Sequence, residues 1–267
     1  MGAHPPGAAV GELFATSRFA LISGRDRRLY RRLYRRSRVG DVMLSHRRRA
    51  VATAVPAVVA VAMGVLFPAA ARRYGPVRGY RYAFAVYWTT CLAVPVALLG
   101  PRRVRQALAL PAGGLPRPQG LAVAALTVPV AGAVAVELRP HLHEVSRAAL
   151  VVAPVVGSIN AVAEELLWRA LPAAAHPDDP VRGWLWPAAA FTAWHLGPLA
   201  VRSHGRGRLL AGAGLIGLGH GWIAWSTGSI AATILPHAAT DSCGIRTAQA
   251  TWLTRAGHTA GGRRPVR

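Results

Sequence analysis

The sequence lacks lysine and is short of charge in general. All 32 basic residues among its 267 are arginine, only 10 residues are acidic, and charged residues make up 16% of the chain. An average soluble domain carries about 25%. Hydrophobic residues make up 52%, and the charges are bunched, so that long apolar stretches remain between them. This composition excludes an ordinary soluble domain and is typical of a protein with several membrane spans.

Several kinds of site and segment are also missing. The two cysteines, Cys91 and Cys243, lie in apolar runs without a Cys-x-x-Cys pair or a disulfide framework, so we interpret them as small buried hydrophobic residues. No His-Glu-x-x-His occurs, which excludes the common zinc-protease helix. Residues 8–24 are interrupted by Glu12 and Arg18, so they do not form the apolar core of a signal peptide.

The excess of arginine does not indicate nucleic-acid binding, although a net charge of +22 would fit it. The arginines lie in the tails and in short connections, where positive charge sets membrane orientation and contacts lipid headgroups. Within the basic tail 1–50, the segment 27–38 would form a helix with an apolar Leu/Tyr stripe among arginines. It is either a helix on anionic lipid or a solvated tail that only sets orientation. Met43 is a natural start for a membrane protein, so residues 1–42 are, as a hypothesis, an over-long reading of the gene.

Apolar runs follow the tail, and most approach the ~20 residues that a helix needs to cross a bilayer. The seven runs are roughly 51–71, 82–100, 119–136, 148–175, 184–201, 208–226 and 228–245. Their Ala, Gly and Val content suits close helix packing in lipid. The sequence therefore predicts an all-α fold, a polytopic transmembrane helical bundle of about seven spans, in a bacterial cell membrane. Six or eight spans stay open, because both basic ends look cytoplasmic and an odd number would separate them.

Three short motifs place polar side chains inside these runs, where a charge costs on the order of 3 kcal/mol. The motifs are EELLWR, FTAWH and HAATD, and their polar residues are Glu164, Glu165, Arg169, His195, His237 and Asp241. Residues four apart share a face of a helix, so Glu165 can pair with Arg169 while Glu164 points about 100° away. By the same spacing, His237 and Asp241 can face one cavity. Three helices can thus bring the remaining polar groups to one cleft.

The motifs match Glu-Glu-x-x-x-Arg, Phe-x-x-x-His and His-x-x-x-Asn/Asp, in that order, within residues 148–245. In this they resemble the CAAX protease and bacteriocin-processing family, also called the Abi family. The resemblance implies an intramembrane endopeptidase that activates water with a glutamate. The implied roles are a general base at Glu164, a water-holding His195 supported by Phe191, an oxyanion site at His237 and Asp241, and a structural pair of Glu165 and Arg169.

Asp241 departs from the asparagine that is often found at its position in the family. An ionised carboxylate cannot donate to an oxyanion, so three roles stay open: a neutral acid that donates, a group that orients His237, or a metal ligand. The metal set would be Glu164, His195, His237 and Asp241, with zinc as one possible divalent ion. The metal-free glutamate mechanism and the metalloprotease mechanism are both compatible with the sequence.

Two further polar features receive structural interpretations. We interpret His220 as a packing or cavity-lining residue, because it has no motif partner. The stretch HLHEVSR (141–147) is interpreted as a polar connection, although His141, His143 and Glu144 are metal-binding residue types.

The resulting division of the chain is the tail 1–50, N-terminal transmembrane helices 51–146, a catalytic membrane core 147–245 and a basic tail 246–267. The expected partners are a peptide or protein substrate in the membrane and anionic lipids at the arginine-rich tail, with no nucleic acid. The family resemblance points to a prenylated C-terminal peptide or a bacteriocin leader peptide as substrate, and the sequence does not distinguish these from a membrane-protein substrate. The alternatives to an enzyme are a non-catalytic scaffold or immunity protein on the same fold and a small proton-coupled transporter. Intact motifs argue against the scaffold, and the lack of repeated halves argues against the transporter.

Overall fold

The structure, a computed structural model, describes residues 44–111, 113–201 and 206–254. The segment 27–38 and the proposed start at Met43 lie outside these residues. Every regular element in the described part is a helix, which confirms the predicted all-α fold.

The α-helices are α3 (His46–Tyr74), α4 (Pro76–Leu99), α5 (Pro101–Leu108), α6 (Gln119–Ala133), α7 (Arg147–Glu165), α8 (Leu171–Ala175), α9 (Trp186–Trp194), α10 (Leu196–Val201), α11 (Arg206–Thr227), α12 (Ala231–Ser242) and α13 (Ile245–Ala248). Five-residue π-helical turns extend or join several of them, at Val134–Leu138, Leu166–Ala170, Val181–Leu185 and Gln249–Leu253. A 3₁₀ turn, Arg139–Glu144, follows the first π turn.

Glycine and proline set the breaks between the first three of these helices. Gly75 and Gly100 each adopt a φ of 79°, in the left-handed region that glycine enters without a steric cost. Pro76 and Pro101 follow at the first helical position, where the missing N–H would have had no partner in the helix. The chain therefore turns sharply after α3 and again after α4.

Within the described residues, five helical segments are long and apolar enough to cross a membrane, by length and composition. They are His46–Tyr74, Pro76–Leu99, Gln119–Glu144, Arg147–Ala175 and Arg206–Thr227, and they correspond to five of the seven predicted runs. The other two runs fold as shorter helices. The run 184–201 is divided at His195 into α9 and α10, and 228–245 contains α12, whose 12 residues reach only about 18 Å.

Large apolar side chains point away from the bundle, as lipid contact requires. Val58, Val61 and Leu235 are 62%, 69% and 76% exposed, while the buried positions include charged groups. This arrangement is the opposite of a soluble protein's surface. With five apolar helices of spanning length, it identifies an integral membrane protein.

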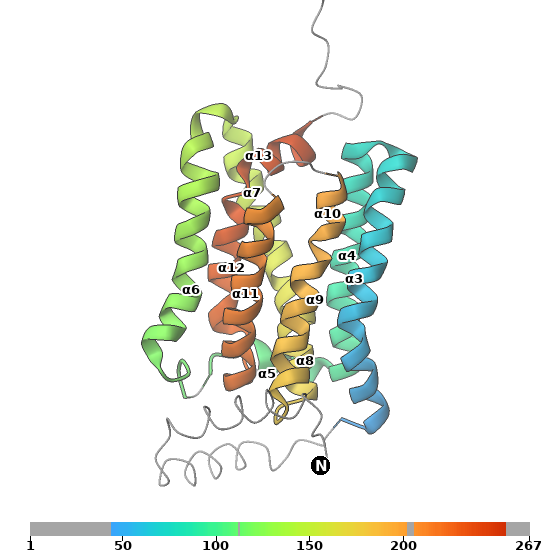
Figure 1. The fold of residues 1–267 in the computed structure, drawn as a ribbon, viewed down its shortest axis with the longest axis vertical. Coiled ribbons are helices and arrows are strands. Elements are labelled where there is room, and N and C mark those ends of the chain that lie inside the picture. The colour runs from blue at the N-terminus through green and yellow to red at the C-terminus, as the bar shows by residue number, and fades with distance from the viewer. Residues whose placement is uncertain (1–43, 112, 202–205, 255–267) are drawn as a thin grey trace, which may run out of the picture. The chain divides into compact units, whose positions relative to one another are not determined.

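The helices that carry the motifs lie side by side in the bundle. Figure 1 shows α3 and α4 on one side of α9, and α6 on the far side of α11 and α12. Helix α7 packs along α12, and small residues allow the two backbones to approach closely. A Cβ on Gly157 of α7 would lie 3.0 Å from the backbone nitrogen of Ser242 and 3.1 Å from Asp241 Cβ. The first and third motifs therefore face each other at short range.

Candidate active site

The two neighbouring glutamates of the first motif end α7, and the π turn Leu166–Ala170 follows them directly. Both side chains are buried, with exposed fractions of 1% for Glu164 and 0% for Glu165. A π turn holds one residue more than an α turn of the same length and is often found at functional sites. Two buried carboxylates next to each other need donors or cations to offset the cost of removing them from water.

Glu164 faces α4 and α12. The Tyr87 hydroxyl donates to Glu164 Oε1 at 2.9 Å, and His237 Nε2 lies 3.3 Å from Glu164 Oε2. Trp168 Nε1 donates in turn to the Tyr87 oxygen at 2.7 Å. One carboxylate oxygen is thus held by a fully buried tyrosine, which leaves the other to interact with His237.

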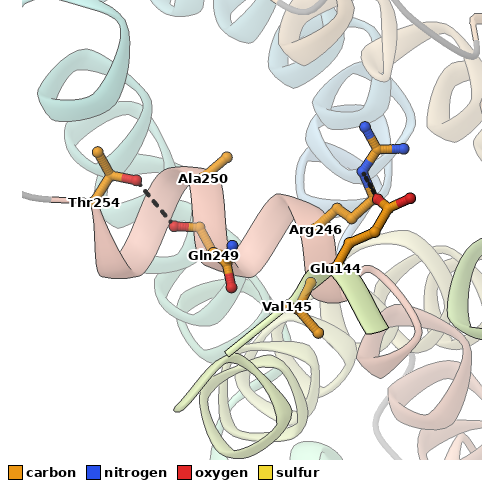
Figure 2. A pocket seen from close by; sticks show the side chains of 6 residues that line it. All are labelled: Glu144, Val145, Arg246, Gln249, Ala250 and Thr254. Atoms are coloured by element: carbon orange, nitrogen blue, oxygen red, sulfur yellow. Dashed lines mark hydrogen bonds and ion pairs between the residues drawn. The ribbon is translucent and has the colours of Figure 1, made fainter. Parts of the chain in front are cut away.

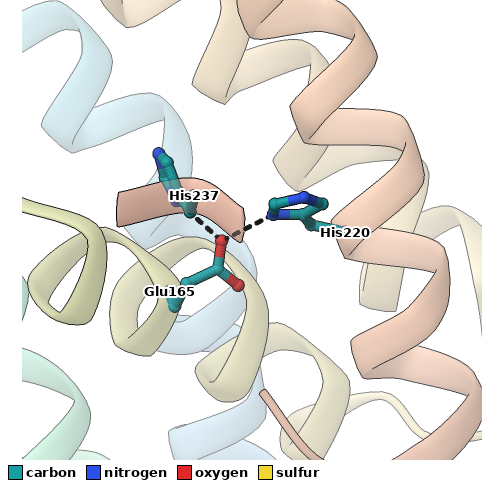
Figure 3. Close-up of side chains that lie close together, drawn as sticks. All are labelled: Glu165, His220 and His237. Carbon is teal, nitrogen blue, oxygen red and sulfur yellow. Dashed lines mark hydrogen bonds and ion pairs between the residues drawn. The ribbon is translucent and has the colours of Figure 1, made fainter. Parts of the chain in front are cut away.

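Glu165 is the acceptor at the centre of a buried cluster (Figure 3). His237 Nδ1 lies 2.8 Å and His220 Nδ1 3.2 Å from Glu165 Oε1, while the Thr233 hydroxyl donates to Oε2 at 2.7 Å. Because a carboxylate only accepts, both imidazole Nδ1 atoms carry hydrogen in these bonds. Helices α7, α11 and α12 are joined through this one carboxylate.

Arg169 lies in the π turn, near Glu165. Its Nε is 3.7 Å from Glu165 Oε1, and its guanidinium carbon is 3.9 Å from the centre of the Phe191 ring. Both terminal nitrogens are buried without a hydrogen-bond partner in the described chain. The structure thus brings together the two residues of the predicted pair, through a single long contact. The spacing was predicted for an α-helix, and the π turn changes the direction of Arg169.

His237 links the two glutamates. Its Nδ1 contacts Glu165 and its Nε2 contacts Glu164, and Nε2 also lies 3.6 Å from Asp241 Oδ2. When an imidazole has a carboxylate beside each of its two nitrogens, it can donate to both sides only if both nitrogens carry a proton. His237 is therefore arranged to be a donor toward the space beside Glu164 and Asp241.

Asp241 lies one turn beyond His237 and is held from the side by α7. Asn160 Nδ2 donates to Asp241 Oδ2 at 2.8 Å, and Trp88 Nε1 donates to Asn160 Oδ1 at 2.8 Å. The Asp241 side chain is 24% exposed, so it lies at the edge of the buried cluster. It is the most open of the predicted acidic site residues.

His195 lies at the junction of α9 and α10. Its Nδ1 donates to the Phe191 carbonyl at 2.8 Å, which makes Nε2 the nitrogen that can accept from water. Its ring packs edge-to-face on Phe191, with centroids 4.8 Å apart. The Phe191 ring also meets His237 edge-to-face at 6.1 Å, so Phe191 contacts both predicted catalytic histidines.

In the part of the chain that the structure describes, two groups of side chains have the composition of a metal site. Glu164, His237 and Asp241 form one, and Glu165, His220 and His237 form the other, with one ligand atom of each member within 4.8 Å of the others. In the first group the donor atoms are 3.3 and 3.6 Å apart, close to the ~3.3 Å edge of a tetrahedral zinc site. His195, the fourth predicted ligand, is not in either group. In the second group Arg169 lies beside the shared carboxylate and disfavours a cation.

Four residues of this site were not predicted from sequence, namely Tyr87, Asn160, His220 and Thr233. His220 was interpreted as packing, and it is fully buried, but it also donates to Glu165. Asn160 and Thr233 each lie four residues before a predicted site residue, Glu164 and His237 respectively. That helical spacing was the available signal for them. Tyr87 has no such signal, because its helix carries no motif.

A surface pocket lies elsewhere, lined by Glu144, Val145, Arg246, Gln249, Ala250 and Thr254 (Figure 2). Glu144 is 3.5 Å from Arg246 and 3.1 Å from His141 Nδ1. The first contact joins the 3₁₀ turn to α13, and the second lies within the turn itself. None of the motif residues lines this pocket.

Residues 146–243 match the family model described as type II CAAX prenyl endopeptidase Rce1-like. No curated protein and no solved structure matches the chain. The match begins at the cap of α7, ends just after α12, and covers all three motifs. It confirms, for this segment, the resemblance to the CAAX protease family.

Proposed function

We propose that this integral membrane protein is an intramembrane endopeptidase in which Glu164 activates water. The observation that carries the proposal is the environment of Glu164. Its carboxylate is buried, held at one oxygen by Tyr87 and faced at the other by His237. The CAAX-endopeptidase-like match over 146–243 supports the same reaction.

The reaction is a balanced hydrolysis. Glu164 takes one proton from water, and the hydroxide adds to the carbonyl carbon of the peptide bond, so that the carbonyl oxygen becomes an oxyanion. The C–N bond then breaks as Glu164 returns the proton to the leaving nitrogen, which gives a carboxylic acid and an amine, and the acid then passes its proton to the amine to give a carboxylate and an ammonium group. A base and an acid at one buried position suit this sequence of transfers, because little bulk water competes for the proton.

Histidines on two other helices complete the arrangement. His195 Nδ1 donates to the Phe191 carbonyl, so its Nε2 accepts a hydrogen from the attacking water and fixes its direction. His237 Nε2 donates to the oxyanion. A fixed donor in a water-poor site stabilises developing charge more than it does in bulk water.

A divalent metal is compatible with the residues present. Glu164, His237 and Asp241 would hold it, and the ion would supply Lewis-acid polarisation of the carbonyl. The protonation state of His237 separates the two cases, because a histidine that ligates a metal through Nε2 cannot donate from that atom.

The proposed substrate is a peptide that reaches the site from the membrane. Outward-facing apolar side chains such as Val61 and Leu235 surround the motif helices with a lipid-facing surface. A prenylated C-terminal peptide, a bacteriocin leader peptide and a membrane-protein segment can all reach the site from the lipid that contacts this surface.

The test is cleavage of these peptide classes by detergent-purified protein, for wild type and Glu164→Gln. Because the amide keeps the shape but cannot accept a proton, we expect turnover to fall by about 10²–10⁴ with normal insertion. Glu144→Gln, an exposed carboxylate outside the site, is the matched control and should retain wild-type turnover.

A chelator added to the wild type separates the two mechanisms. Reversible loss of turnover would support metal dependence. Turnover of Glu164→Gln within about tenfold of wild type would contradict the assignment of Glu164. If the wild type cleaves none of the peptides, the scaffold and transporter alternatives take its place.

A further inference from the structure

Asn160 lies one turn before Glu164 on α7, so both side chains project from the same face. Across from them, His237 and Asp241 are one turn apart on α12. The contacts therefore form two rungs between the helices, Glu164 to His237 and Asn160 to Asp241. The second rung continues the proposed catalytic centre by one helical turn.

Trp88 determines which end of the Asn160 amide faces Asp241. An indole N–H only donates, and Trp88 Nε1 lies 2.8 Å from Asn160 Oδ1. The oxygen of the amide is therefore directed toward Trp88, and the NH₂ group toward Asp241. The usual ambiguity between the two ends of an asparagine amide is removed by a neighbour that can play only one role.

The hydrogens of Asn160 are only partly used by this contact. Its NH₂ group carries two hydrogens, and the bond to Asp241 Oδ2 at 2.8 Å takes one of them. Asn160 and Asp241 are both half-buried, and within the described residues Asp241 is the one acceptor of the Asn160 amide, so the second hydrogen is left for a ligand. Asp241 Oδ2, by contrast, accepts from Asn160 and faces His237 at 3.6 Å, and so acts as an acceptor.

We propose that Asn160 is a catalytic residue whose free N–H donates to the oxyanion, and that Asp241 is the residue that positions it. The proposal rests on the peptidase function proposed above. An oxyanion site needs a donor, and position 241 holds an acceptor. In this proposal the amide donor comes instead from Asn160 on the facing helix α7. His237 and Asn160 then donate from opposite helices to the same developing charge.

No bond to Asn160 forms or breaks in the reaction. As water adds to the carbonyl carbon, the C=O electrons move onto oxygen, and the hydrogen bond from Asn160 shortens and strengthens. The proton removed from water remains on Glu164 until the amine leaves. The contribution of Asn160 is therefore specific to the transition state, and it affects kcat more than KM.

The experiment compares the wild-type chain with Asn160→Asp, Asp241→Asn and the double variant that carries both changes. Asn160→Asp keeps the shape and replaces the NH₂ group by an oxygen, so we expect kcat to fall by about 10²–10³, the usual cost of one lost oxyanion donor, with KM within about threefold. In the double variant the amide and the carboxylate exchange helices. It should recover to within about tenfold of wild-type kcat.

Two further readouts separate a catalytic donor from a residue that only joins α7 to α12. Affinity for a tetrahedral phosphonate analogue of the substrate should fall in Asn160→Asp by the same factor as kcat/KM. The double variant, in which an amide again faces a carboxylate, should keep a Tm close to that of wild type, whereas Asn160→Asp alone sets two carboxylates against each other. A kcat of Asn160→Asp within tenfold of wild type, or a loss of kcat accompanied by an equal rise in KM, would overturn the proposal.

Failure of this inference is distinct from failure of the proposed function. If the wild type cleaves peptide and Glu164→Gln does not, the peptidase stands whatever Asn160 does. An Asn160→Asp protein that is fully active in that setting would refute only the role of Asn160. A wild type without activity on any peptide class would refute both.

Discussion

At the scale of single residues, Glu165 is the most heavily bonded charge in the site. Its carboxylate accepts from His220, His237 and Thr233, and Arg169 adds a longer ionic contact. Arg169 has no comparable set of partners, because its terminal nitrogens are buried without one in the described part of the chain. Arg169 therefore relies on Glu165 to offset its buried charge, whereas Glu165 has other partners besides Arg169.

This asymmetry predicts unequal costs of mutation. Glu165→Ala should lower the free energy of unfolding by about 3–5 kcal/mol, because it leaves Arg169 as an unpaired buried cation. Arg169→Ala should cost less, because Glu165 keeps three donors. Thermal unfolding in detergent measures both, and a double-mutant cycle should show that the second change partly restores what the first one lost. Strictly additive effects would show that the two charges are independent.

Residue spacing predicted the contacts within a helix but not those between helices. Glu165 with Arg169, and His237 with Asp241, are four apart and lie within ionic reach in the structure. Asn160 with Asp241, and His220 with Glu165, join different helices. Their meeting depends on the register and rotation of two packed helices, which no local spacing specifies.

At the scale of elements, the approach of α7 to α12 sets the geometry of both rungs. Gly157 permits that approach, since a Cβ there would lie within about 3.1 Å of Asp241 and Ser242, as described above. Ser242 contributes its backbone nitrogen to this contact, so it cannot rotate away as a side chain would. The end of α12 that carries Asp241 must therefore move if a methyl group is added.

We expect Gly157→Ala to lower kcat by about tenfold or more, because small displacements of catalytic groups are costly. Gly64→Ala is the matched control, since it is also a mid-helix glycine and a Cβ there meets nothing within 4 Å. The control should keep activity and gain some stability from its lower unfolded-state entropy. Equal activities of the two variants would show that α7 and α12 tolerate separation.

Apolar runs predicted the long helices well, because a span needs about 20 apolar residues and the composition shows them. They did not predict how 184–201 and 228–245 fold. The first run is divided at His195, and the second contains the short α12. Proline inside a helix gave no reliable boundary, since Pro56 and Pro68 both lie within α3. The break at His195 and the shortness of α12 depend on how the helices pack in the bundle, and the sequence alone does not specify that packing.

At the scale of the whole molecule, charge and apolar surface are separated along the chain. Arginines are concentrated in the tail 1–50 and in connections, while exposed valines and leucines cover the long helices. Basic groups beside apolar spans are typical of segments that contact lipid headgroups. We propose that the segment 27–38 binds anionic lipid, and the alternative is a solvated tail that only sets orientation.

A peptide of residues 27–38 should bind vesicles that contain anionic lipid more tightly than neutral vesicles, and 1 M salt should reduce the binding. Replacing Leu29 and Leu33 by serine keeps the charge and removes part of the apolar stripe, so this control should bind more weakly. Fluorescence or co-sedimentation measures the partition. Equal binding to neutral and anionic vesicles at low salt would refute an electrostatic role.

The π turn Leu166–Ala170 bears on which changes of chain length the protein can accept. Deleting one residue from an ordinary α-helix rotates everything beyond it by about 100°, which would turn buried side chains toward lipid. A π turn already contains one extra residue, so a deletion within it converts it to an α turn and leaves the helices on both sides in phase. A one-residue deletion should therefore be tolerated here and not in α3: it would alter the site, while the bundle would still assemble.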